Sequence, residues 1–262
     1  MNIIACIKQV PGTTKVEVDP VTGVLKRDGI ESKMNPYDLY ALETAVRLKE
    51  QVGGIVKVIS MGPPQAKEII KEAYTMGADE GMLISDRKFA GADVLATSYT
   101  LSQGIRKLGD YEVIICGKQT TDGDTAQVGP EIAEYLGIPH IANVRKIEEL
   151  NESSMLVEMD MGDTIEVSEI KFPCLITVDK GIFEPRLPSY KKKLSTKDRV
   201  ISVTSFKDLE DQDENKYGLS GSPTQVERIF PPKVNKDREI WTGNAEEISN
   251  KIINKLKALK LV

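Results

Sequence analysis

Residues 55–85 read IVKVISMGPPQAKEIIKEAYTMGADEGMLIS, and this stretch decides the fold. Its apolar start, residues 55–60, predicts a buried strand, and residues 64–76 predict a helix that Gly77 ends. Residues 82–85 predict the next buried strand. A strand, a helix and a second strand of this length form the unit that places two parallel strands side by side.

The same unit repeats on both sides of this stretch. Upstream, residues 3–10 predict a buried strand, and Asn35 and Pro36 begin a helix that ends at Gly53. Downstream, a helix over residues 93–108, a strand over 112–116 and a helix over roughly 126–136 follow in order. This alternation predicts an α/β fold with a mostly parallel sheet covered by helices on both faces.

The pattern changes after residue 137. Short strands are expected over residues 141–147, 155–159, 163–167 and 174–178, and we expect them to form an antiparallel extension of the sheet. A small hairpin is expected over residues 15–27. From Glu184 the chain becomes polar, which predicts an extended arm that needs a partner surface, with a final amphipathic helix over residues 245–259. The expected division is residues 1–185 and 186–262.

Composition excludes several classes of protein. The chain has 262 residues, a net charge of −5 and 5% aromatic residues, which argues against a nucleic-acid binder. Its cysteines, Cys6, Cys116 and Cys174, have neither the spacing of a metal site nor that of a disulfide framework. No signal peptide or membrane-length apolar run is present, so we expect a cytoplasmic protein with reduced thiols and no membrane insertion.

A ligand is expected beyond the carboxyl ends of the parallel strands, where four loops meet. The most informative loop, residues 117–130, reads GKQTTDGDTAQVGP. Its glycines allow a close backbone approach, and a helix N-terminus after it suits a pyrophosphate. Asp122 and Asp124 suit ribose hydroxyls. The alternative is a well-capped connection without a ligand, although its length favours a ligand.

The fingerprints of common nucleotide enzymes are absent. The chain has no Gly-x-Gly-x-x-Gly after the first strand and no Gly-x-x-x-x-Gly-Lys-Ser/Thr. The single histidine, His140, is interpreted as structural, and no catalytic residue or metal cluster is visible. A nucleotide site without acid–base groups suits a cofactor that carries its own chemistry. An autonomous adenine-nucleotide enzyme, such as a hydrolase, is the alternative from another class.

These features together resemble one family, the electron-transfer flavoprotein beta subunits. The stretches that carry the resemblance are ACIKQVP (5–11), MNPYD (34–38), SMGPP (60–64), GAD (77–79) and the loop 117–130. The resemblance implies a Rossmann-like, adenine-nucleotide-binding α/β domain over residues 1–185. It also implies a C-terminal arm over residues 186–262 that packs on an alpha subunit.

The resemblance also implies site residues. Those around FAD, or around AMP as the alternative, are Ala5, Asn35, Pro36, Tyr37, Asp38, Met61, Gly91, Ala92, Asp93, Thr97, Gly117, Gln119, Thr120, Thr121, Asp122, Gly123, Asp124, Thr125, Ala126, Gln127 and Val128. The segment Leu187, Pro188, Ser189 and Tyr190 looks like the loop through which partner dehydrogenases dock. No metal site is implied.

Members of this family are of two kinds. Housekeeping members hold AMP as a structural ligand, whereas electron-bifurcating members hold FAD, take hydride from NADH and divide the electrons between ferredoxin and a second acceptor. The stretches FAGAD (89–93), DGDTAQVGP (122–130) and GSPTQV (221–226) look like the bifurcating kind, although Val94 stands where many of its members carry Thr. The implied partners are the alpha subunit, ferredoxin and a flavin dehydrogenase or reductase of the acyl-CoA or 2-hydroxyacid dehydrogenase type.

Overall fold

The computed structural model describes residues 1–12, 32–227 and 238–262. The expected hairpin over residues 15–27 lies outside the described residues. The chain forms two compact units, Met1–Glu227 and Arg228–Val262, and each is described by itself.

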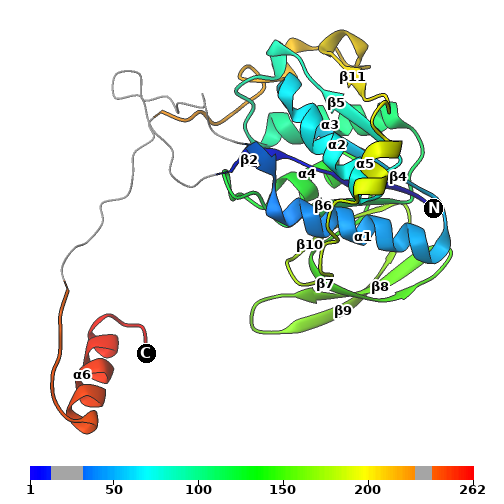
Figure 1. The fold of residues 1–262 in the computed structure, drawn as a ribbon. Coiled ribbons are helices and arrows are strands. Elements are labelled where there is room, and N and C mark those ends of the chain that lie inside the picture. Colours follow the sequence, from blue (N-terminus) through cyan, green and yellow to red (C-terminus); the bar gives the residue numbers. More distant parts are fainter. Residues whose placement is uncertain (13–31, 228–237) are drawn as a thin grey trace. The chain divides into compact units, whose positions relative to one another are not determined.

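The first unit is built on one large sheet (Figure 1). Within the described residues, nine strands form it, in the spatial order β11-β5-β4-β1-β6-β10-β7-β8-β9. Their bounds are β1 Asn2–Cys6, β4 Ile55–Met61, β5 Glu80–Ile84, β6 Val113–Gly117, β7 His140–Leu150, β8 Ser154–Asp160, β9 Ile165–Lys171, β10 Cys174–Val178 and β11 Ser202–Thr204. The strands from β11 to β7 are mutually parallel, and β7, β8 and β9 pair antiparallel.

The expected helices cover both faces of this sheet. They are α1 Pro36–Val52, α2 Lys67–Met76, α3 Val94–Leu108 and α4 Val128–Leu136. A short helix that the sequence did not predict, α5 Tyr190–Ser195, follows in the same unit, and the expected final helix, α6 Ala245–Ala258, belongs to the second unit. The side chains of each strand alternate between two cores, because successive residues of a strand point to opposite faces. Ile3 and Ala5 pack with α1 and α2, whereas Ile4 and Cys6 pack with α3 and α4. The predicted mostly parallel α/β fold is confirmed.

Two strand predictions need correction. The expected antiparallel extension holds for β7, β8 and β9, but β10 is parallel to both of its neighbours, β6 and β7. All five residues of β10 are buried, which is typical of a parallel strand covered on both faces. The expected strand over residues 3–10 ends at Cys6, because Gln9–Pro11 forms a separate strand, β2, which pairs with β3, Ser32–Met34.

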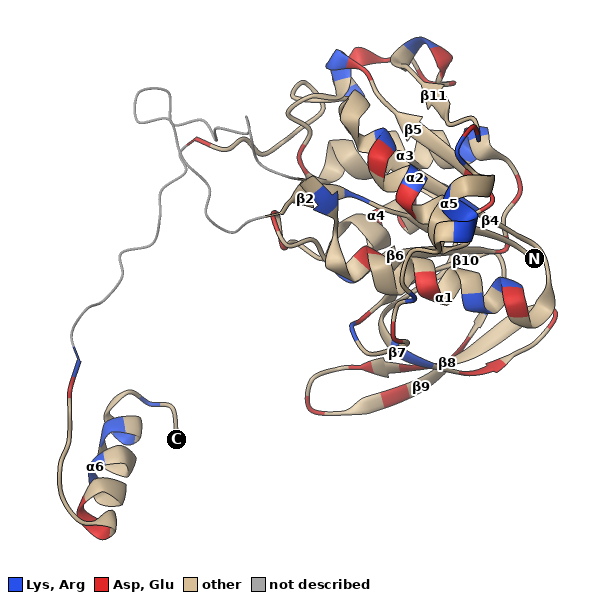
Figure 2. Cartoon of the chain, viewed as in Figure 1, with Lys and Arg blue, Asp and Glu red and all other residues tan. Residues whose placement is uncertain are grey.

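Residues 186–227 fold onto the first unit, so the compact units divide after Glu227 and not after residue 185. Strand β11 extends the sheet beside β5, and Phe206 and Tyr217 are buried against α3 and Phe89. Short 3-10 turns lie at Pro64–Ala66, Arg87–Phe89, Phe206–Asp208 and Glu214–Lys216. Three lysines in succession give α5 its positive charge, visible in Figure 2.

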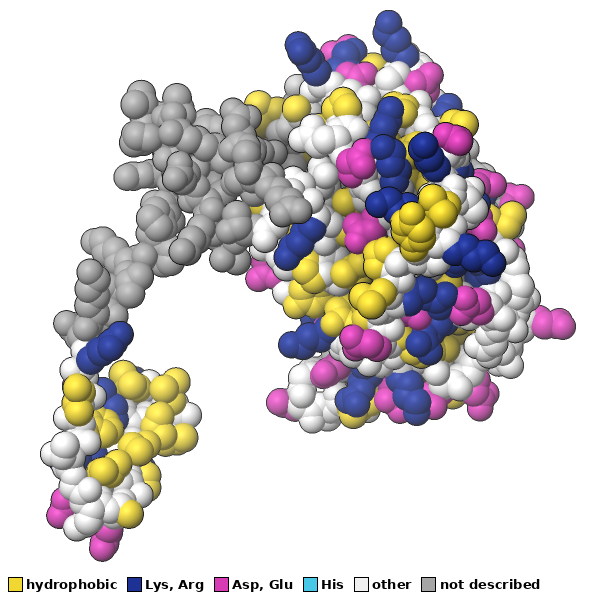
Figure 3. Space-filling model, in the orientation of Figure 1, with side chains coloured by type: hydrophobic (Ala, Val, Ile, Leu, Met, Phe, Trp, Pro, Cys, Tyr) yellow, Lys and Arg dark blue, Asp and Glu magenta, His cyan; other side chains and the backbone are white. Residues whose placement is uncertain are grey.

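The second unit consists, in its described part, of α6 and the residues next to it. The side chain of Asn244 accepts a hydrogen bond from the Glu247 amide at 2.9 Å and thereby caps the helix. Its apolar residues Ile252 and Ile253 are 44% and 46% exposed, and Figure 3 shows hydrophobic side chains along this helix. None of the described helices combines the length and the apolar character needed to cross a membrane.

Candidate functional site

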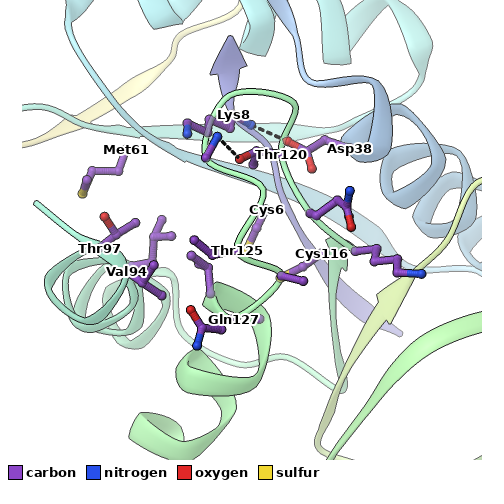
Figure 4. Close-up of a pocket in the computed structure, with 18 of the residues that line it drawn as sticks. Cys6, Lys8, Asp38, Met61, Val94, Thr97, Cys116, Thr120, Thr125 and Gln127 are labelled. Carbon is purple, nitrogen blue, oxygen red and sulfur yellow. Dashed lines mark hydrogen bonds between the residues drawn. The ribbon is translucent and has the colours of Figure 1, made fainter. Parts of the chain in front are cut away.

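A cavity of about 330 Å³ lies where the order of the parallel strands reverses. From β1 the chain continues to β4 and β5 on one side, and it then returns to β6 on the other side. The carboxyl ends of β1, β4 and β6 therefore open into one crevice, the place where ligands bind in sheets of this kind. Figure 4 shows how Cys6, Met61 and Cys116 meet there with residues from the loop after β6.

Most of the predicted site residues line this cavity. They are Asp38, Met61, Ala92, Asp93, Thr97, Gly117, Gln119, Thr120, Gly123, Thr125, Ala126, Gln127 and Val128. These residues come from the start of α1, the end of β4, the start of α3 and the loop between β6 and α4. Segments far apart in the sequence are thus brought to one place.

Eight predicted residues do not line the cavity: Ala5, Asn35, Pro36, Tyr37, Gly91, Thr121, Asp122 and Asp124. Ala5 is buried in the core on the α1 side of the sheet. Asn35 instead holds the loop in place, because its Nδ2 donates to the Gln119 carbonyl at 2.9 Å and its Oδ1 accepts from the Thr121 amide at 3.2 Å. Pro36 and Tyr37 begin α1, and Gly91 lies in the turn before α3.

The cavity also contains lining residues that sequence reasoning missed: Cys6, Ile7, Lys8, Leu101 and Cys116. Val94, singled out in the sequence, and Lys118 and Gly129, within the loop 117–130, line it as well. The strand alternation carries a signal for two of the missed residues. Since Ala5 faces the α1 side, its neighbour Cys6 must face the other side, and Cys116 is its register partner on β6.

The loop between β6 and α4 has an unusual backbone. Asp124 and Ala126 have φ values of 55° and 57°, in the left-handed region. For an alanine this conformation costs roughly 1–2 kcal/mol. It also explains why α4 begins at Val128 and not at residue 126. Strained residues of this kind are concentrated at ligand sites.

The free N-terminus of α4 faces the cavity. The side chain of its N-cap residue, Gln127, makes no capping hydrogen bond, and Gln127, Val128 and Gly129 all line the cavity. The N–H groups at a helix start are available to an anion, and the helix dipole favours negative charge there. The start of α3 differs, because Asp93 accepts from the Ala96 amide at 3.1 Å and from the Thr224 hydroxyl at 2.7 Å.

The two lysines among the lining residues are both held by carboxylates. The Nζ of Lys8 lies 2.8 Å from Asp122, and the Nζ of Lys118 lies 2.8 Å from Asp179. Partial burial raises the pKa of Asp122, but the hydrogen bonds from Lys8 outweigh it, so the pKa is lowered. The ion pair with Lys8 joins the loop to the end of β1.

Asp38 is a buried carboxyl group at the inner end of the cavity. Burial raises its pKa from 3.8 to about 7, against hydrogen bonds from the Asn35 side chain and the Lys8 amide. These two donors lie 2.9 Å and 2.7 Å from the carboxyl oxygens. Gly117 is required opposite this group, because a Cβ there would lie 2.5 Å from Oδ1 of Asp38.

The lining set fits a phosphate-bearing nucleotide. The uncapped helix start and the two lysines suit phosphate, and the Thr97, Thr120 and Thr125 side chains carry hydroxyl groups. Apolar side chains beside them suit a flat ring. Among the described residues no cluster of three His, Cys, Asp or Glu side chains is arranged to hold a metal ion.

Comparison with known proteins gives a consistent result. Residues 22–208 match the family model described as the electron transfer flavoprotein domain. The chain is 45% identical over 263 residues, all of both chains, to the electron transfer flavoprotein subunit beta of Thermoanaerobacterium thermosaccharolyticum. It is 45% identical over 257 residues, 98% of each chain, to the subunit of the same name in Clostridium acetobutylicum.

A third relative carries a more specific name. The chain is 40% identical over 264 residues, all of both chains, to the caffeyl-CoA reductase-Etf complex subunit CarD of Acetobacterium woodii. The family model covers well over half of the chain, and these relatives match it from end to end. The chain therefore belongs to the electron transfer flavoprotein family and is a member of its beta subunits.

Proposed function

We propose that this beta subunit binds FAD in the cavity at the ends of β1 and β6 and works in an electron-bifurcating complex. The observation that carries the proposal is the uncapped start of α4, which faces the same cavity as Lys8 and Lys118. Among the lining residues no nucleophile is paired with a base, which suits a site that holds a cofactor and leaves the chemistry to it. When bound, FAD would supply hydride acceptance from NADH and one-electron transfer.

The residues have distinct roles in this proposal. The amides of Gln127 and Val128 bind the pyrophosphate, with Lys8 as a nearby cation, and the carboxylates of Asp122 and Asp124 accept from ribose hydroxyls. Asn35 holds the loop through its contacts with Gln119 and Thr121. A cavity of about 330 Å³ is at the lower end of the usual range for small molecules, about 300–1,000 Å³. A dinucleotide therefore extends beyond it, and we place its ring system at the junction with the alpha subunit.

Bifurcation is favoured over a structural AMP by the loop sequence and by one relative. The stretch 122–130 looks like that of bifurcating members, and a relative that matches the whole chain is named as a subunit of a caffeyl-CoA reductase complex. Val94 lines the cavity with an apolar side chain, so it offers no hydroxyl contact to a ligand.

The proposed partners are the alpha subunit, ferredoxin and a flavin dehydrogenase or reductase. Leu187 and Tyr190 are 87% and 74% exposed, which suits a docking segment. Figure 3 shows hydrophobic side chains beside lysines on the part of the surface formed by α5. Exposed apolar residues next to positive charge suit a partner with an acidic rim.

The decisive experiment identifies the bound nucleotides. The chain is co-expressed with its alpha subunit, the purified complex is denatured, and the released nucleotides are separated and quantified. FAD at twice the concentration of the heterodimer, without AMP, is the expected result. Equal amounts of FAD and AMP would refute bifurcation and leave a housekeeping electron carrier. Turnover of ATP by the isolated chain would instead support the autonomous enzyme.

A further inference from the structure

Two cysteines face each other across neighbouring strands at the floor of the cavity. Cys6 is the last residue of β1, and its register partner on β6 is Cys116. Paired residues on adjacent strands point to the same face of the sheet. Both thiols belong to the core on the α3 and α4 side, and both line the cavity.

The geometry of this pair suits a covalent link. Adjacent strands lie about 4.7–4.9 Å apart, within the Cα separation of about 4.4–6.8 Å that disulfides require. Because β1 and β6 are parallel, the Cβ atoms of the pair have about the same spacing, so the two strands must move a few tenths of an ångström closer to reach the Cβ separation of about 3.5–4.5 Å. The two side chains are 9% and 5% exposed, and what exposure they have is toward the cavity. Cys174 provides a contrast, because it is completely buried in the other core, does not line the cavity, and has Val113 as its register partner on β6.

We propose that Cys6 and Cys116 form a redox-modifiable dithiol that a hydroperoxide converts to a cross-strand disulfide, and that a nucleotide in the cavity shields it. In the first step one thiol takes an oxygen from the hydroperoxide, whose O–O bond breaks and releases an alcohol or, from hydrogen peroxide, water. In the second step the other thiol attacks this sulfenic acid, the S–S bond forms, and water leaves. The dithiol loses two electrons and two protons, which the hydroperoxide accepts.

The reaction is expected to be slow. The neighbouring Cys6 thiol, followed by burial, raises the pKa of Cys116 well above its usual value, so this thiol keeps its proton at neutral pH. Thiolates are the reactive species, and a protonated, buried thiol reacts slowly. A disulfide between paired strands is therefore expected under sustained oxidation and not on brief exposure.

The shielding of the dithiol by a nucleotide rests on the proposed function, whereas disulfide formation does not. A nucleotide in a cavity of about 330 Å³ covers its floor, so a small oxidant no longer reaches the two sulfurs. The disulfide depends only on the register and the access of the pair. The two parts of the proposal can therefore fail separately.

The test uses the full chain in complex with its alpha subunit, after bound nucleotide has been removed by dialysis against a chaotropic salt. The complex is treated with hydrogen peroxide, free thiols are alkylated, and peptides are mapped by mass spectrometry without reduction. We expect the free thiols of this chain to fall from three to one, with a reducible cross-link between the peptides that contain Cys6 and Cys116. The Cys174→Ser variant is the matched control and is expected to form the same cross-link.

Several results would overturn the proposal. Three free thiols after prolonged treatment, or oxidation of Cys174 at the same rate as the pair, would show that the cavity does not give access to the dithiol. Over-oxidised cysteines without a cross-link would show that the two sulfurs do not meet. In a second experiment the same treatment is carried out with saturating FAD or AMP, which is expected to keep all three thiols free over the same interval. A cross-link that forms equally fast with nucleotide would leave the dithiol in place and refute the shielding.

Discussion

The substitution Asp38→Asn tests the electrostatics of the cavity directly. Asp38 is only 5% exposed, and burial raises the pKa of its carboxyl group from 3.8 to about 7. In the unfolded chain the same group has an ordinary pKa and is ionised above pH 4. The folded protein therefore holds a proton on Asp38 that the unfolded chain has lost.

The size of the effect follows from this difference. One pKa unit corresponds to about 1.4 kcal/mol, so a rise of roughly three units costs the wild type about 4 kcal/mol once the group is ionised. The cost is absent below pH 4, grows as the pH rises, and is complete above pH 7. Asparagine cannot ionise, so the stability of the wild type should decrease relative to Asp38→Asn by about 2 kcal/mol between pH 5 and pH 7.

Urea unfolding of both chains at half-unit steps from pH 5 to pH 8 measures this difference. Only the change with pH is diagnostic, because asparagine also places an amide group opposite the Lys8 amide donor and lowers the stability at every pH. The control is Asp208→Asn, since hydrogen bonds from Ser205 lower the pKa of Asp208 and keep it ionised throughout. Parallel curves for wild type and Asp38→Asn would refute the reasoning and show that water reaches the carboxyl group.

Three further substitutions address the loop, the ion pairs of Arg186 and the residues of the arm that pack on the first unit. Asp122→Ala removes the partner of Lys8 and a proposed ribose acceptor, so less nucleotide should remain bound per chain after gel filtration. Arg186→Gln leaves Glu43, whose side chain is 1% exposed, with Arg47 and the backbone amide of residue 186 as its remaining partners, and should lower the free energy of unfolding by about 2 kcal/mol. Tyr217→Ala removes a buried ring and should cost about 3–5 kcal/mol in urea unfolding.

Matched variants separate these effects from general damage. Unchanged nucleotide content in Asp122→Ala would contradict the placement of the ligand. Glu50→Gln removes only the exposed partner of Arg186 and should cost at most about 1 kcal/mol, so an equal loss in both variants would contradict the role of Glu43. Tyr217→Phe keeps the ring and should cost about 1 kcal/mol, because only the hydrogen bond to the Asp211 carbonyl is lost.

The sequence predicted the repeating part of the fold well, because local signals mark the ends of its helices. Gly53 and Gly77 end helices as expected, Gly109 and Gly137 end α3 and α4 in the same way, and Asp93 caps the start of α3. Each of these signals acts within one turn of the chain. The alternation of strands and helices could therefore be read without knowledge of the tertiary structure.

Strand pairing and the late part of the chain were harder to predict. The partner of β10 is set by the whole topology, although its continuous apolar run, Cys174–Val178, was a usable signal for a parallel strand. The stretch after Glu184 is polar on average, so the few aromatic residues in it that pack into the core were not predicted. Phe206 and Tyr217 are 4% and 1% exposed, and they fix residues 186–227 to the first unit.

At the site, the sequence indicated which loop lies at the cavity, but not which polar side chains position that loop and which are available to a ligand. The motif around Asn35 indicated a ligand contact, whereas the side chain positions Gln119 and Thr121. The reason is that a polar residue beside a cavity can bind either a ligand or the backbone of a neighbouring loop. Local pattern does not distinguish the two.

The position of β10 has a consequence for how the chain acquires its structure. This strand lies between β6 and β7 in space but follows β9 in sequence. During synthesis β6 therefore has no neighbour on its outer side until residue 178 has left the ribosome. An unpaired central strand invites association with other chains, so nascent protein is exposed to aggregation during this interval. Fragments that end before Cys174 should for the same reason fail to give a soluble domain, although they contain all the residues that line the cavity.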